Sequence, residues 1–105
     1  MNNVNLSPQE IHDTKFFINF FSQIPEEQWT TGVLSFHGKF CAAGHLLDKT
    51  PKFYGENVMK LTYLLGKLHK YFHIISLNDN FNNEAIEYGK TPKERMINAL
   101  KSLLE

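Results

Sequence analysis

WTTGVLSFHGKFCAAGHLL, residues 29–47, is the stretch on which the expected fold depends. It holds the only tryptophan, the only cysteine, three of the six glycines and two of the five histidines. Gly38 supplies the positive φ of a tight turn, and we expect a short helix from there to about Asp48. Residues 41–44 are small, so this helix is expected at the centre of the fold. Gly44 costs ~1 kcal/mol relative to alanine within a helix, which predicts a close backbone contact there.

Two capping-box sequences predict where helices begin on either side of that stretch. The segment SPQE, residues 7–10, predicts a helix that ends near residue 22, and TPKE, residues 91–94, predicts one that ends near residue 104. A third helix is expected from residue 56 to about 71, because apolar residues recur there at intervals of three and four. These apolar residues are Val58, Leu61, Leu65, Leu68 and Phe72.

The expected architecture is all-α or mainly α, with about four principal helices in a single domain over residues 7–105. Residues 1–6 are expected to fray. One or two short extended segments are allowed, near residues 33–36 or 73–77, where the pattern does not separate strand from helix. A turn is expected at Asn78, Asp79 and Asn80, followed by a polar surface loop over residues 81–89.

Composition bounds the function. The chain has 105 residues, with eleven acidic and eleven basic side chains. That balance does not favour nucleic acid or a membrane as the partner, although lysines and tyrosines along residues 49–71 leave a basic aromatic face open. A single cysteine allows no internal disulfide. The polar first residues lack a signal-peptide pattern, and no apolar run approaches ~20 residues. We therefore expect a soluble, cytoplasmic protein.

Four landmarks carry a resemblance. They are W-x-x-G from Trp29, G-x-x-C-x-x-G-x-L from Gly38, the pair Asn78-Asp79, and the threonine-capped closing helix at residues 91–104. In these the chain resembles, over about residues 24–104, a family of short bacterial and phage proteins catalogued as a domain of unknown function. It departs from the family pattern at His45, where alanine is usual. The resemblance implies kinship of fold and no mechanism.

Cys41 is the candidate nucleophile, because it follows a glycine turn near an expected helix start, where the helix dipole favours a thiolate. Groups that could activate or orient it follow later in the chain: His73, Asn78 and Asp79. The same order of residue types occurs in papain-like cysteine hydrolases. The alternative is that Cys41 is a small buried apolar residue, which free cysteine commonly is.

The remaining candidates concern ligands and metals. Four side chains could line a small-molecule or peptide pocket, or could simply fill the core: Trp29, Phe40, His45 and Tyr54. Histidines and the cysteine also recur at intervals of four, at His37, Cys41 and His45 and at His69 and His73. No zinc motif accompanies them, so we assign no metal site and no cofactor.

These observations favour a non-enzymatic interaction or regulatory protein, from a phage or other mobile element, that binds an unidentified protein partner or associates with itself. A small cysteine-dependent hydrolase or transferase using Cys41 is the alternative. An enzyme needs Cys41 to open onto a cleft with an imidazole within reach, whereas an interaction module needs an exposed apolar surface.

Overall fold

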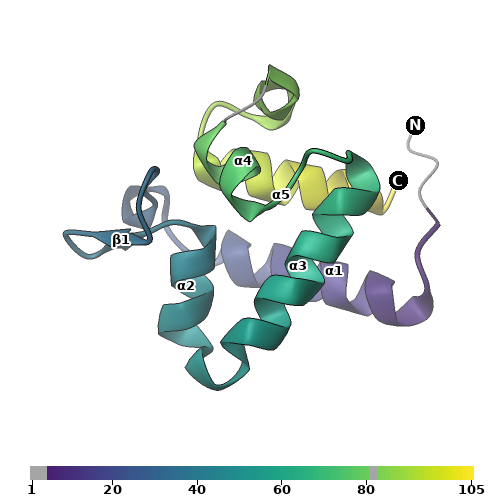
Figure 1. Ribbon diagram of the computed structural model, residues 1–105, viewed down its shortest axis with the longest axis horizontal. Helices are drawn as coiled ribbons and strands as arrows, with labels where there is room; N and C mark the ends of the chain where they lie inside the picture. Colours follow the sequence, from purple (N-terminus) through teal and green to yellow (C-terminus); the bar gives the residue numbers. More distant parts are fainter. Residues whose placement is uncertain (1–4, 81–82) are drawn as a thin grey trace.

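The computed structural model describes residues 5–80 and 83–105, and these form a mainly α domain, as predicted (Figure 1). The described elements are α1 (Pro8–Ser22), η1 (Glu26–Gln28), β1 (Ser35–Phe36), β2 (Lys39–Phe40), α2 (Ala42–Lys49), η2 (Pro51–Phe53), α3 (Tyr54–Leu68), α4 (Ile74–Asp79), η3 (Asn83–Tyr88) and α5 (Pro92–Leu103). No helix within these ranges has the length and apolar character needed to cross a membrane.

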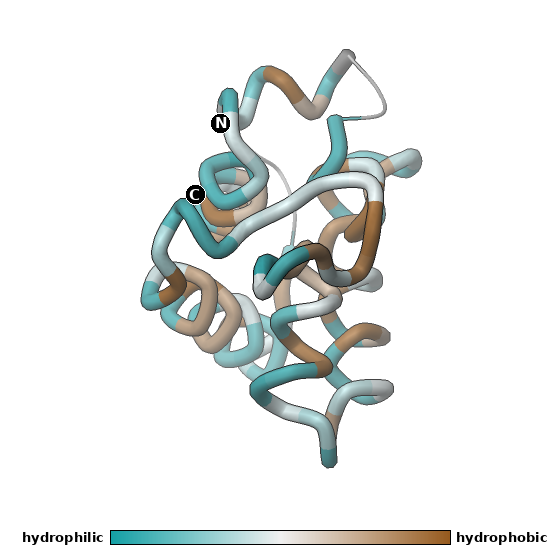
Figure 2. Tube along the Cα trace, turned by 90° about the vertical axis from the view of Figure 1, so that its left-hand side faces the viewer, coloured by the Kyte–Doolittle hydropathy of each residue, from teal (hydrophilic) through white to brown (hydrophobic). Residues whose placement is uncertain are grey.

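The first and last helices begin where their capping boxes predict. Ser7 caps α1 and Thr91 caps α5, and in each case the glutamate three residues later closes the box. α1 packs most extensively against α5, and α3 packs against both of them. Hydrophobic and hydrophilic stretches alternate along the helices (Figure 2), as amphipathic helices require. The largest fully buried apolar side chains of these three helices are Phe17, Phe21, Leu61, Leu64, Leu65, Met96, Leu100 and Leu103.

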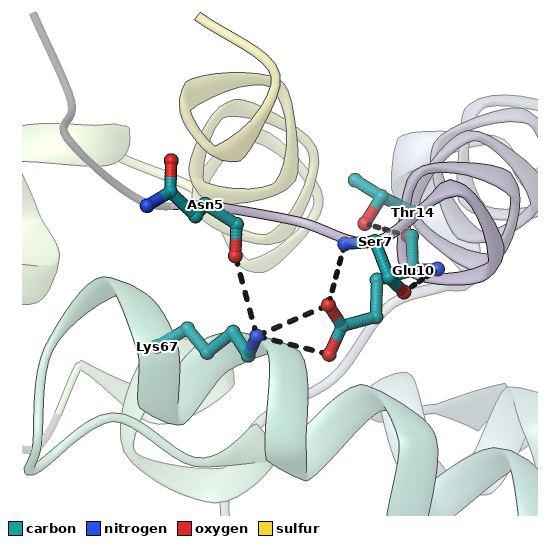
Figure 3. Close-up of polar contacts among 5 residues, drawn as sticks. All are labelled: Asn5, Ser7, Glu10, Thr14 and Lys67. Atoms are coloured by element: carbon teal, nitrogen blue, oxygen red, sulfur yellow. Dashed lines mark hydrogen bonds and ion pairs between the residues drawn. The ribbon is translucent and has the colours of Figure 1, made fainter.

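The start of α1 is tied to α3 by one lysine (Figure 3). Lys67 forms an ion pair with Glu10, with 3.0 Å between Nζ and Oε2, and also donates to the carbonyl of Asn5. The backbone N–H of Ser7 and the Lys67 ammonium both donate to Glu10 and lower the pKa of its carboxyl. Leu6 packs against the core. Of the segment predicted to fray, residues 1–4 lie outside the described residues.

The stretch 29–47 folds differently from its prediction in one respect. Gly38 does adopt a positive φ, of +80°, but it forms the tip of a β-hairpin together with His37, whose φ is +49°. Positive φ at both central residues is the type I′ geometry that fits the twist of paired strands. β1 and β2 pair antiparallel, with Phe36 opposite Lys39. The helix therefore starts only at Ala42, with Cys41 as its N-cap.

The predicted place of α2 is also corrected. We expected the other helices to wrap around it, but α2 lies to one side of the α1, α3 and α5 group (Figure 1). Cys41, Ala42 and Gly44 are buried, whereas the second half of α2 carries exposed Leu47, Asp48 and Lys49. The close approach predicted at Gly44 is confirmed, because the backbone carbonyl of Leu34 fills the space of a Cβ there.

The segment after α3 is helical. α3 runs from Tyr54 to Leu68, so it begins and ends earlier than the predicted range of residues 56–71. It ends at Leu68 because His69 adopts an extended backbone. His73 caps α4, which settles residues 74–77 as helix. Asn78 and Asp79 form the last turn of α4, and the left-handed residue is Asn80, with φ +57°. Of the polar segment 81–89, residues 81–82 lie outside the described residues and η3 covers the next six.

Candidate functional site

An open cavity of about 390 Å³ lies between α2, α3, α4 and residues 32–34. Its volume falls within the ~300–1,000 Å³ typical of ligand pockets. The wall is mainly apolar, and its aliphatic residues are Val33, Leu34, Ala43, Val58, Ile74 and Ile75. All four side chains predicted as catalytic candidates line the same cavity: Cys41, His73, Asn78 and Asp79. The fold thus brings together residues up to 38 positions apart in the sequence.

Asn78 joins three segments that meet at the cavity. Its side chain is buried, its Oδ1 accepts from the backbone N–H of Ala42 at 3.0 Å, and its Nδ2 donates to the carbonyl of Thr30 at 3.0 Å. The first bond satisfies a free N–H at the start of α2, and the second holds the segment that precedes β1. A buried amide that uses both its oxygen and its nitrogen in this way positions the backbone, and its described bonds do not include one to the ring of His73.

Asp79 fixes the neighbouring wall. One carboxylate oxygen accepts from the backbone N–H of Gly32 at 2.9 Å, and the other accepts from the Asn78 amide at 2.6 Å. The bond to Gly32 holds residues 32–34 beside α4, where Val33 and Leu34 complete the cavity wall. The turn predicted from the sequence Asn78-Asp79 would have made local bonds, whereas these two side chains reach residues 36 to 48 positions away.

Arg95 holds the end of α4, a role that the sequence did not predict. It is buried, its Nε donates to the carbonyl of Leu77 at 2.7 Å, and its Nη2 donates to the carbonyl of Asn78 at 2.6 Å. Burial lowers the pKa of the guanidinium, and the negative charge of Asp79 opposes that shift. One sequence signal was present: Arg95 lies four and eight residues before Ala99 and Leu103, on the buried face of α5.

Cys41 is a structural cap in this arrangement. Its side chain is 8% exposed, and its Sγ accepts from the backbone N–H of Gly44 at 3.4 Å. Its own N–H donates to the carbonyl of Leu34 at 3.2 Å. The thiol therefore lies at the cavity wall with one lone pair engaged in capping α2. Thiol nucleophiles need access and an activating base, and the exposure of Cys41 is small.

His73 is poorly placed to act as that base. Its Nδ1 accepts from the backbone N–H of Ser76 at 3.4 Å, within the capping box of α4. In the neutral ring the proton then lies on Nε2, and such a ring has no free acceptor for a thiol proton. Over residues 5–80 and 83–105, no hydrogen bond joins Cys41 to His73.

Three of the four predicted ligand-binding residues lie elsewhere. Trp29, Phe40 and His45 form a ring cluster under the hairpin, with His45 5.1 Å from the Trp29 ring centre and 5.3 Å from that of Phe40. They do not line the cavity, whereas Tyr54 does. Trp29 and His45 are buried there, which was the alternative that the sequence left open, whereas Phe40 is half-buried.

His45 is neutral within that cluster. Its ring is fully buried, Nε2 donates to the carbonyl of Gln28 at 3.0 Å, and Nδ1 accepts from the Lys49 ammonium at 3.1 Å. Burial, followed by the positive charge of Lys49, lowers the pKa of His45 to about 4. The imidazole is thus a structural group at neutral pH.

The histidines and lysines form no further site among the described residues. No group of three metal-ligating side chains comes together in residues 5–80 and 83–105. His37 lies in the hairpin turn, and both ring nitrogens of His45 are hydrogen-bonded to Gln28 and Lys49. Lys60 and Lys67 form ion pairs with Glu56 and Glu10, which reduces the basic character of the face predicted along α3.

No family model, curated protein or solved structure matches this chain. The chain's own geometry is therefore what supports a functional proposal.

Proposed function

We propose that this protein is a non-enzymatic interaction module that holds an apolar side chain of a partner protein in the cavity between α2, α3 and α4. The observation that carries the proposal is the cavity's apolar wall together with its exposed apolar rim. Val33, Leu34 and Ile75 line the cavity and are 49%, 44% and 52% exposed. Contiguous apolar side chains around a concave site are typical of protein-binding surfaces.

The rim residues are held in place by polar contacts that belong to the fold. Asp79 binds the backbone of Gly32, and the carbonyl of Leu34 accepts from Cys41. These bonds keep apolar side chains at the surface that would otherwise gain free energy by collapsing into the core. A preformed wall of this kind reduces the ordering cost of binding.

The proposal includes a cytoplasmic setting, which rests on the single cysteine, and kinship with the family of short bacterial and phage proteins. That kinship rests on the spacing of Trp29, Gly38, Cys41 and Gly44.

An NMR titration with toluene tests the proposed function. Toluene is small enough to enter the cavity without a partner protein. Saturable shifts of backbone amides are expected in residues 32–34, 43 and 74–75, because these line the cavity. The matched variants Ile75→Gln and Ile86→Gln provide the control, since both isoleucines are about half exposed and only Ile75 lines the cavity. The proposal fails if toluene produces no saturable shifts, or if both variants weaken binding equally.

A cysteine-dependent hydrolase or transferase is the second candidate, because Cys41, His73, Asn78 and Asp79 line one cavity. Alkylation of native protein by iodoacetamide separates the two functions. The interaction module predicts slow alkylation that becomes fast on denaturation, since Cys41 is buried and serves as a cap. Fast native alkylation that is lost in His73→Ala would favour the enzyme.

A further inference from the structure

The charge of the cavity bears on which partner it accepts, and the inference drawn from it rests on the proposed function. Within residues 5–80 and 83–105, Asp79 is the only carboxylate that lines the cavity, and neither lysine nor arginine lines it. Among the described residues, no basic side chain lies within the 4.0 Å of an ion pair with Asp79. An apolar cavity with one carboxylate that lacks an ion-pair partner favours a cationic group on the molecule that enters.

Asp79 retains capacity to accept further hydrogen bonds. A carboxylate offers about four acceptor positions, and the described bonds to Asp79 come from the Gly32 N–H and the Asn78 amide. The charge of Arg95 attracts Asp79 at a distance, but the described bonds of its guanidinium go to the carbonyls of Leu77, Asn78 and Gly89, so these acceptor positions stay open. Asp79 is partly exposed, so a cation can reach it from the cavity mouth.

We infer that the partner presents an apolar side chain next to a lysine or arginine, with the apolar group in the cavity and the cation at Asp79. Ile75 and Val33 contact the apolar body of this segment at the rim, and the carboxylate selects against an acidic neighbour. The cation adds specificity more than affinity, because a partly exposed ion pair contributes only a few-fold to binding.

Three acetylated and amidated tripeptides, Leu-Phe-Lys, Leu-Phe-Gln and Leu-Phe-Glu, test the inference by NMR titration at low salt. The lysine peptide is expected to bind about fivefold more tightly than the glutamine peptide, the upper range for a partly exposed ion pair. The glutamate peptide is expected to bind most weakly. Raising the ionic strength should reduce the difference between lysine and glutamine, because salt screens a partly exposed pair.

Two variants test whether Asp79 causes the preference for the lysine peptide over the glutamine peptide. Asp79→Asn should bring the lysine and glutamine peptides to equal affinity, whereas Asp48→Asn should leave their ratio unchanged, because Asp48 lies outside the cavity. Should Asp79→Asn fail to fold through loss of its bond to Gly32, the salt dependence of the wild-type protein decides the question.

The outcomes separate this inference from the proposed function. Equal affinity for all three peptides overturns the inference and leaves the interaction module intact. Absence of binding by every peptide and by toluene overturns both. Lysine amide that binds as tightly as the tripeptide overturns the inference, since no apolar group is then needed. Self-association without peptide, seen by sedimentation and lost in Ile75→Gln, also overturns it, because the occupant is then a second copy of the chain.

Discussion

The carbonyl oxygen of Leu34 occupies the space that a side chain at Gly44 would need. The same oxygen accepts from the backbone N–H of Cys41, so the hairpin is seated directly on the first turn of α2. This contact sets the wall of the cavity, because Leu34 and Cys41 both line it. A glycine in the first turn of α2 is therefore a requirement of tertiary packing, and its unfavourable helix propensity is offset by the contact it permits.

Gly44→Ala should destabilise the protein by ~1–3 kcal/mol, because a methyl group there meets a backbone atom that cannot move aside. Gly66→Ala is the control. Gly66 lies within α3, and an added Cβ meets nothing within 4 Å, so this variant should gain ~0.5–1 kcal/mol from helix propensity. Urea unfolding followed by circular dichroism measures both. Equal effects in the two variants would contradict the packing of Leu34 on Gly44.

His45 makes the stability of the protein depend on pH. The pKa of His45 is about 4 in the folded protein, whereas an unperturbed histidine, as in the unfolded chain, has a pKa of 6.5. The unfolded chain therefore binds the proton first as pH falls. Above pH 6.5 the titration of His45 does not change the free energy of unfolding. Between pH 6.5 and pH 4 it lowers the free energy of unfolding by ~3 kcal/mol. Urea unfolding at pH 7 and pH 4.5 measures the loss. His45→Asn, which does not titrate, should be less stable at pH 7 but should lose less on acidification; an identical pH profile in the variant would assign the loss to other groups.

Arg95→Met should destabilise the protein by ~2–4 kcal/mol, because it leaves the carbonyls of Leu77 and Asn78 buried without their donors. Lys101→Met on the exposed side of α5 is the matched control and should change stability by no more than ~0.5 kcal/mol. Thermal unfolding compares the two. If Arg95→Met is as stable as the control, the guanidinium does not support α4 in the way that its contacts indicate.

Local hydrogen bonds made the starts of α1 and α5 predictable. Each capping box joins two residues that are three positions apart: Ser7 with Glu10, and Thr91 with Glu94. The sequence alone therefore contains both partners of each cap. The start of α2 depended instead on the pairing of β1 with β2, and two-residue strands leave no readable period. Gly38 was correctly expected in a turn, but the partner strand that makes it a hairpin tip is a tertiary property.

The candidate site was predictable only as a set of residue types. The order of Cys41, His73 and Asn78 in the chain marked residues that the fold does bring to one cavity. Their bonds were not predictable, because Asn78 reaches the backbone of Thr30 and Ala42 across 48 and 36 positions. A burial pattern on α5 did mark Arg95, but charge on an apolar face does not say which carbonyls it serves.

Filling the cavity is the most direct test of the central claim, that the space between α2, α3 and α4 receives an apolar group. Ala43→Phe places a ring from α2 into the cavity, and Leu47→Phe places the same ring one turn later, outside it. With folding confirmed by circular dichroism, toluene affinity measured by NMR should fall at least tenfold in Ala43→Phe and stay unchanged in Leu47→Phe. Wild-type affinity in Ala43→Phe would contradict the account.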